Sequence, residues 1–277
     1  MADDRPLDEQ VTYRVEDGIA RVTINAPDQG NSLSMPMRDR VGDLMEEASS
    51  DLAVRAVILT GAGTKHFCTG ANLGGPRPPK PARPDGAPDR AMGDAARLIK
   101  RGWQRLIASV LDCEKPVVGA INGTAAGGGA QLAIACDLIL MADTARLIEV
   151  FVRRGIMPDA GGAYLLPRIV GLPKAKELMF LGDDVSAEEA VRLGLANRAL
   201  PAAELDGAAT ELAARLAAGP TKAIAMTKWL VNRSLESSRQ GSFDDEAFAQ
   251  ELVNSTEDAA EGMTAFVERR PPSFKGW

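Results

Sequence analysis

Two loops rich in small residues have the composition of a backbone site that binds a carbonyl oxygen. The first spans residues 67–73, with the sequence FCTGANL, and the second spans residues 122–132, with the sequence NGTAAGGGAQL. The glycines at 127–129 open a predicted helix, so N–H groups at its positive end face outward without a side chain in the way. Two converging N–H donors form an oxyanion hole, where each donor contributes on the order of 3–4 kcal/mol to transition-state stabilisation. Viewed alone, either loop is more typical of a tight packing turn.

Several other chemistries lack the residues that they need. The 277-residue chain has one histidine, His66, and three scattered cysteines, Cys68, Cys113 and Cys136. These are too sparse for a zinc site or a CxxC redox pair. The P-loop, dinucleotide-binding and nucleophile-elbow motifs do not occur. Carboxylates and backbone dipoles therefore remain as the groups that could do chemistry.

The charge balance argues against two classes of partner. Lys and Arg number 32, Asp and Glu number 38, and the formal net charge is −6. An acidic chain without a long basic run is a poor candidate for binding nucleic acid or an anionic membrane surface. No apolar run approaches the roughly 20 residues that span a bilayer. The separated thiols and the lack of a signal peptide predict a reducing, cytoplasmic setting.

The two glycine loops must be positioned by strands and helices, and the pattern of the first part of the chain predicts a layered α/β core. Residues 11–24 alternate as a β-hairpin that turns at Asp17-Gly18, and Ser34 is suited to cap the helix that follows. Further strands are predicted over residues 54–59, 116–121, 138–142 and 145–151. Residues 76–88 hold six of the 17 prolines and predict an exposed loop before a helix over residues 90–111.

The remainder of the chain reads almost entirely as helix. Helices are predicted over about 186–194, 201–218, 221–235, 243–254 and 256–268, the first of them opened by a capping box at Ser186. The sequence therefore predicts two parts, an α/β core over residues 1–200 and a helical region over residues 201–277. Amphipathic helices after an α/β core are typical of an oligomerisation element.

A series of motifs resembles the crotonase superfamily, also called the enoyl-CoA hydratase/isomerase family. In chain order they are NSLS at 31–34, VRAVILTG at 54–61, FCTGANL at 67–73, KPVV at 115–118, NG at 122–123, the glycines at 127–129, ACD at 135–137, PDAGG at 158–162 and FVERR at 266–270. The resemblance runs over about residues 11–275, and so many motifs in this order are highly specific. It implies a crotonase-type spiral of ββα units, a C-terminal helical trimerisation region, and trimers that often pair into hexamers.

The resemblance also implies an acyl-CoA thioester as substrate, whose enolate is held by the backbone N–H groups of Ala71 and Gly128. Coenzyme A arrives as part of the substrate, so no separate cofactor or metal is expected. Asn72 stands where the family more usually has an aspartate. The residues implied to bind coenzyme A are Thr69, Ala71 and Leu73 for the adenine, Lys65 for the phosphates, and Phe266 and Arg269 for coenzyme A bound at an adjoining subunit.

The acid/base residues differ from those of the family's hydratases. Hydratases use two glutamates, and the matching positions here hold Gln131 and Phe151, neither of which exchanges a proton near neutral pH. Asp159 stands where hydratases often have glycine. Together with Phe151, the PDAGG motif is similar to the branch that contains epoxyphenylacetyl-CoA isomerase, in which one aspartate shuttles a proton. The resemblance thus implies Asp159 as the single acid/base, with Gln131 orienting a thioester or a water.

Alternatives remain open for both the residue and the function. Asp159 also suits the N-cap of a helix. Glu149 lies two residues before Phe151, so on a strand it shares that residue's face. The leading hypothesis is an acyl-CoA isomerase. The second is an enoyl-CoA hydratase that uses Asp159 or Glu149 while Gln131 positions water. The third is a non-catalytic acyl-CoA-binding or RNA-associated homologue, although the acidic charge argues against RNA.

Overall fold

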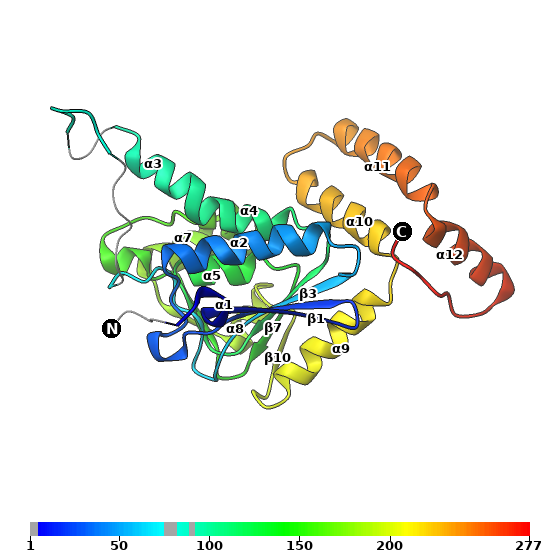
Figure 1. Cartoon of the computed structure of the whole chain (residues 1–277), viewed down its shortest axis with the longest axis horizontal. Coiled ribbons are helices and arrows are strands. Elements are labelled where there is room, and N and C mark those ends of the chain that lie inside the picture. Colours follow the sequence, from blue (N-terminus) through cyan, green and yellow to red (C-terminus); the bar gives the residue numbers. More distant parts are fainter. Residues whose placement is uncertain (1–4, 75–81, 89–91) are drawn as a thin grey trace.

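The computed structural model describes residues 5–74, 82–88 and 92–277, which form two β-sheets flanked by helices (Figure 1). The larger sheet has the strand order β1-β2-β3-β5-β7-β10. Its strands are β1 (Val11–Glu16), β2 (Ile19–Ile24), β3 (Ala56–Gly61), β5 (Val117–Ile121), β7 (Leu138–Ala142) and β10 (Arg198–Leu200). The β1–β2 pair is the predicted antiparallel hairpin, and all other pairs in this sheet are parallel.

A second, smaller sheet brings the two glycine loops together. Its strands are β4 (His66–Cys68), β6 (Thr124–Ala126), β8 (Arg146–Ile148) and β9 (Asp184–Ser186), in that order. The first three are parallel to one another, whereas β9 is antiparallel to β8. The carboxyl ends of β4, β6 and β8 therefore lie at one edge, where the residues after each strand meet.

From β3 to β8, successive strands alternate between the two sheets and helices follow each pair, which confirms the predicted ββα recurrence. β3 and β4 precede α3 (Asp94–Ile99), the π-helical turn η2 (Lys100–Gln104) and α4 (Arg105–Leu111). β5 and β6 precede α5 (Gly128–Ile134). β7 and β8 precede the 3-10 helix η3 (Val150–Arg154), α6 (Gly162–Val170) and α7 (Leu172–Leu181). The α2 helix (Met35–Ser50) begins at the predicted cap, because the Met37 N–H donates to the Ser34 hydroxyl.

Three predictions need correction or restriction. The strand predicted over 145–151 covers only Arg146–Ile148, because on one side β6 ends at Ala126 and on the other side the pairing with β9 stops at Asp184, where that strand begins. The stretch 123–129, predicted as a turn, contains strand β6. The first part of the predicted loop, residues 76–81, and the first two positions of the predicted helix, 90–91, lie outside the described residues. Residues 82–88 contain neither helix nor strand.

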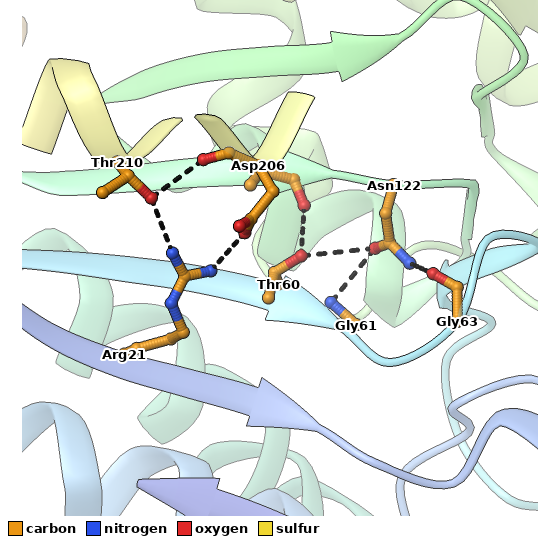
Figure 2. A network of polar contacts seen from close by, with 8 residues as sticks. Arg21, Thr60, Gly61, Gly63, Asn122, Asp206 and Thr210 are labelled. Atoms are coloured by element: carbon orange, nitrogen blue, oxygen red, sulfur yellow. Dashed lines mark hydrogen bonds and ion pairs between the residues drawn. The ribbon is translucent and has the colours of Figure 1, made fainter. Parts of the chain in front are cut away.

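The C-terminal helices α10 (Thr221–Ser234), α11 (Arg239–Asn254) and α12 (Glu257–Glu268) extend away from the sheets (Figure 1). The preceding helices are α8 (Ala187–Arg192) and α9 (Leu205–Ala217), and α9 is held on the larger sheet. Arg21 of β2 donates to Asp206 at 2.7 Å and to Thr210 at 2.9 Å on α9 (Figure 2). The boundary near residue 200 stays a prediction, while α9 contributes fully buried alanines to the core.

A partly buried ion pair joins α10 to the core. Lys228 Nζ donates to Asp137 Oδ2 at 2.8 Å and to the Val110 carbonyl at 2.9 Å. The same carboxylate oxygen accepts the Val117 N–H at 2.7 Å. The two side chains are 8% and 22% exposed, so neither charge can be solvated fully if its partner is removed.

We therefore expect Lys228→Met to lower the free energy of unfolding by about 3 kcal/mol, because it leaves a buried carboxylate without its cation. Urea denaturation measures this loss. The matched control is Lys222→Met on the same helix, which breaks only an exposed pair with Glu114 and is expected to cost less than about 0.5 kcal/mol. Equal losses in the two variants would contradict the assignment.

Candidate active site

A cavity of about 170 Å³ lies against the residues that follow β4, β6 and β8. Its wall combines backbone, apolar side chains, one carboxylate and one guanidinium. The lining residues are Thr69, Gly70, Ala71, Leu73, Trp103, Gly127, Gly128, Val150, Phe151, Arg154, Ile156 and Asp159. The sheet edge thus gathers segments that are far apart in the sequence into one site.

Two amide side chains hold the turn before β4: Asn31, whose Nδ2 donates to the Ala62 and His66 carbonyls at 3.0 and 2.7 Å, and Asn122, which directly follows β5. Asn122 Oδ1 accepts the Gly61 N–H at 3.1 Å, and its Nδ2 donates to the Gly63 carbonyl at 2.7 Å (Figure 2). Nδ2 also contacts the His66 carbonyl at 3.2 Å. These bonds fix the path of the chain into β4 and therefore the position of the loop that follows it.

The loop after β4 presents one unpaired N–H group to the cavity. The Leu33 N–H donates to the Gly70 carbonyl at 2.8 Å, and the Asn72 N–H donates to the Leu33 carbonyl at 2.9 Å. Between these two bonds, the Ala71 N–H has no acceptor among the described residues. Gly70 has a φ of 89°, and a Cβ there would lie 3.3 Å from the Gly128 nitrogen. The two glycine loops are therefore in direct contact.

The loop after β6 presents a second unpaired N–H group. The Gly127 N–H donates to the Ile148 carbonyl at 3.0 Å, whereas the Gly128 N–H, at the start of α5, meets no acceptor in the described chain. A Cβ on Gly128 would lie 2.6 Å from the Trp103 ring, which closes over this residue. The N–H groups of Ala71 and Gly128 thus border one cavity, as an oxyanion hole requires.

Asp159 is the carboxylate in the cavity wall. It is half-buried, and burial raises its pKa from the usual value, partly offset by a hydrogen bond with its own backbone N–H. The alternative of a helix cap is wrong, because α6 has Gly161 as its N-cap and no side chain caps it. Phe151, which is 6% exposed, lies in the same wall. A carboxyl with a raised pKa therefore shares the cavity with the two N–H donors.

Gln131 is placed elsewhere. Its side chain is fully buried behind the cavity wall, and Nε2 donates to both carboxylate oxygens of Glu149, at 2.7 and 2.8 Å. Burial raises the pKa of Glu149 to about 7. The expectation that Glu149 and Phe151 share a strand face is wrong, since β8 ends before either residue. Neither Gln131 nor Glu149 lines the cavity.

Of the residues implied to bind coenzyme A, Thr69, Ala71 and Leu73 line the cavity. Lys65, Phe266 and Arg269 do not. Lys65 is exposed at the start of β4, while Phe266, 81% exposed, and Arg269 lie at the end of α12. The amide of Asn72 donates to Gln29 Oε1 at 2.9 Å, a bond that an ionised aspartate could not donate.

Two cavity residues, Trp103 and Arg154, are not among those singled out from the sequence. Arg154 lines the cavity and forms no ion pair among the described residues, whereas its neighbour Arg153 pairs at the surface with Asp184 at 3.4 Å. Trp103 is both a core residue and part of the cavity wall. The one sequence signal for a large residue at this place is Gly128, whose missing side chain leaves room for it.

The described residues form neither a metal site of clustered side chains nor a helix that could span a membrane. No group of three or more His, Cys, Asp or Glu side chains there is arranged to hold a metal ion. None of the helices in the described ranges is long and apolar enough to cross a membrane.

Comparison with known proteins identifies relatives along nearly the whole chain. Residues 14–277 match the family model described as enoyl-CoA hydratase/isomerase. The 1,2-epoxyphenylacetyl-CoA isomerase of Escherichia coli is 33% identical over 268 residues, which is 97% of this chain and 99% of the relative. The short-chain-enoyl-CoA hydratase of Clostridium acetobutylicum is 34% identical over 262 residues, covering 94% and 95%.

The fold also matches solved structures. The crystal structure of an enoyl-CoA hydratase from Bacillus anthracis superposes with a TM-score of 0.85 at 30% identity, covering 97% of this chain and 100% of that one. The predicted crotonase-type architecture is therefore confirmed. Relatives named as isomerase and as hydratase are equally similar, so overall identity does not separate the two reactions.

Proposed function

Because the chain belongs to the enoyl-CoA hydratase/isomerase family of the crotonase superfamily, whose members act on acyl-CoA thioesters, we propose that it is an acyl-CoA isomerase. The reaction would move a double bond between the 3- and 2-positions of the acyl chain, or open a related strained ring. The observation that carries the proposal is Asp159, the single carboxylate among the described residues that line the cavity. Gln131 and Phe151 stand where hydratases have glutamates.

The proposed mechanism uses one carboxylate twice. The thioester oxygen accepts hydrogen bonds from the Ala71 and Gly128 N–H groups. Asp159 takes a proton from C2 of a 3-enoyl thioester, and the electron pair of the broken C–H bond moves into an enolate whose oxygen the two N–H groups stabilise. The protonated Asp159 then returns the proton to C4. Burial supports this role, since a raised pKa brings the carboxyl closer to the basicity that the step needs.

An enoyl-CoA hydratase is the second candidate, and the position of Glu149 weakens it. Hydration needs a group that activates water as well as one that protonates the α-carbon. Glu149 is bonded to Gln131 behind the cavity wall and would have to leave that partner to reach a substrate. A non-catalytic acyl-CoA-binding homologue is less well supported, because the carboxylate and both N–H donors are present.

The proposal includes the assembly and the location of the enzyme. Large apolar side chains are exposed on α10 to α12, which supports a homotrimer or hexamer: Trp229, Phe243, Phe248, Phe266 and Val267. In such an assembly Phe266 and Arg269 would contact coenzyme A bound to an adjoining subunit, and Lys65 would contact its phosphates. The three free, buried cysteines suit a reducing cytoplasm.

Arg154 is expected to assist substrate binding. We expect Arg154→Met to raise KM for acyl-CoA substrates about tenfold with kcat little changed, because one charge-assisted hydrogen bond contributes about 1.5 kcal/mol. Steady-state kinetics measure this change. Arg153→Met removes the same charge from the neighbouring residue outside the cavity and should leave KM near the wild-type value. A tenfold rise in both variants would indicate general electrostatic attraction instead.

The function is tested by supplying purified protein with a 3-enoyl-CoA and a 2-enoyl-CoA in separate reactions. The ultraviolet absorbance of the conjugated thioester reports both directions. An isomerase raises the absorbance from the 3-enoyl substrate. A fall in absorbance from the 2-enoyl substrate that is accompanied by a 3-hydroxyacyl-CoA product would favour the hydratase, whereas a fall accompanied by the 3-enoyl-CoA alone is the reverse isomerisation.

A further inference from the structure

One buried polar pair joins three of the segments that build the cavity. Gln131 lies on α5, one turn after Gly128, and Glu149 directly precedes η3, which carries Phe151 and Arg154. The Gln131 amide also lies against Gly162, the first residue of α6, where a Cβ would be only 2.6 Å from Nε2. Gln131 is fully buried and Glu149 is 6% exposed. The pair therefore lies where α5, the start of η3 and the start of α6 meet. It thus helps to fix the path of the chain from Phe151 to Asp159.

The hydrogen-bond pattern of this pair is incomplete if Glu149 is ionised. Gln131 Nε2 donates to both carboxylate oxygens, while Gln131 Oε1 is buried and has no partner. A buried acceptor without a donor costs free energy, and so does a buried charge without a counter-charge. A proton on Glu149 removes both costs, because its O–H can donate to Oε1 while Nε2 donates to the other carboxyl oxygen.

Among the described residues, the surroundings of Glu149 offer no compensating cation. Side chains from the neighbouring elements that line a small void beside it are all apolar, among them Ile134, Leu147, Leu166, Leu178 and Val185. The charged groups on the neighbouring elements have other partners or positions. Arg146 and Arg153 pair with Asp184, Lys174 pairs with Glu177, Arg168 stacks on Tyr164, Lys176 is exposed on α7, and Arg154 and Asp159 line the cavity. Burial accordingly raises the pKa of Glu149 to about 7, and the Gln131 bond lowers it only in part.

We propose that Glu149 is kept as a neutral acid, and that the cyclic acid–amide pair it forms with Gln131 is a positioning unit that fixes the segment carrying Asp159 against α5. The positioning part rests on the proposed function, in which Asp159 moves the proton. Ionisation of Glu149 removes the second hydrogen bond and loosens that segment. Gln131 therefore acts through Glu149 and Asp159 instead of touching the substrate.

The sign of the pH effect follows from the direction of the pKa change. The folded-state pKa of Glu149 lies above its unfolded value, so the folded chain binds more protons between about pH 4.5 and pH 7. The contribution of this group to stability is therefore greatest at low pH and declines as pH rises through that window. With a pKa of about 7, the neutral fraction falls by about tenfold from pH 6 to pH 8, and we expect kcat to fall with it.

The test compares Glu149→Gln with Glu149→Leu. The glutamine variant keeps two reciprocal hydrogen bonds at every pH, so it should remove the alkaline fall in kcat and reduce the pH dependence of Tm. The leucine variant loses the pair and should lower kcat across the whole range while KM stays close to the wild-type value. Glu177→Gln, which removes a surface carboxylate from α7, is the matched control and should keep the wild-type pH profile.

Infrared difference spectroscopy tests the neutral acid without any substrate. The wild-type protein at pH 6 should show a protonated-carboxyl band that disappears on raising the pH and is missing in Glu149→Gln. Absence of that band, or an alkaline fall in kcat that persists in Glu149→Gln, would overturn the proposal. A band in a protein that does not turn over 3-enoyl-CoA would overturn the proposed function and the positioning role, while the neutral pair itself would stand.

Discussion

Replacing Asp159 with asparagine is expected to lower kcat on a 3-enoyl-CoA by about 1,000-fold, within the range that general acid–base groups supply. Asparagine preserves the shape of the side chain but cannot take up the proton. KM should change little, because Asp159 acts on the transition state and contributes little to ground-state binding. Stopped-flow or steady-state absorbance of the conjugated thioester measures the loss.

The fold should survive this substitution. Asp159 caps no helix, and its raised pKa reflects the cost of burying a charge, so the neutral amide removes no stabilising ion pair. Tm near that of the wild type is the required control. Asp184→Asn offers a second control, since that carboxylate pairs with Arg146 and Arg153 outside the cavity. Wild-type turnover by Asp159→Asn would refute the assignment of the base.

Gly70→Ala is expected to have the second-largest effect, a loss of at least about 100-fold in kcat, which is the cost of removing one oxyanion-hole donor. The new methyl group would lie 2.9 Å from the Ala126 carbonyl and 3.3 Å from the Gly128 nitrogen. It would therefore separate the two glycine loops or cover one of the two donors. The same kinetic assay measures the loss, and circular dichroism checks the fold.

Gly63→Ala is the matched control, because it also places alanine at a positive φ, but the new methyl group there meets no close neighbour. Gly63 has a φ of 79°, against 89° at Gly70, and the nearest atom to its Cβ would be 3.5 Å away. Both variants should lose similar stability from the positive φ. If Gly63→Ala lost as much activity as Gly70→Ala, backbone strain and not the geometry of the hole would explain the effect.

The two glycine loops that border the cavity could be predicted from sequence because their signal is local. The small residues at 67–73 and the glycines at 127–129 leave the backbone of both loops uncovered by large side chains. The family resemblance implies that Ala71 and Gly128 hold the enolate, and the structure brings both residues to one cavity because β4 pairs in parallel with β6. The C-terminal helices were predicted for the same local reason, since their apolar residues recur at helical spacing.

The errors concern features that depend on distant parts of the chain. Residues 145–151 read as one strand, yet pairing stops at Ile148 because neither β6 nor β9 extends beyond the residue opposite it. The 3-10 helix that replaces the end of the strand takes Arg154 to the cavity and leaves Glu149 behind it. The hydrogen bonds between Gln131 and Glu149 depend on how α5 packs against the segment that follows β8. This packing cannot be predicted from a local sequence pattern.

The fate of the oxygen in water distinguishes an isomerase from a hydratase. The protein is incubated with a 3-enoyl-CoA, and separately with a 2-enoyl-CoA, in water labelled with heavy oxygen, and the masses of the products are measured by mass spectrometry. We expect the two enoyl thioesters to interconvert with no labelled oxygen incorporated, because one carboxylate moves one proton and water takes no part. A labelled 3-hydroxyacyl-CoA formed at a comparable rate would contradict this expectation and identify the enzyme as a hydratase.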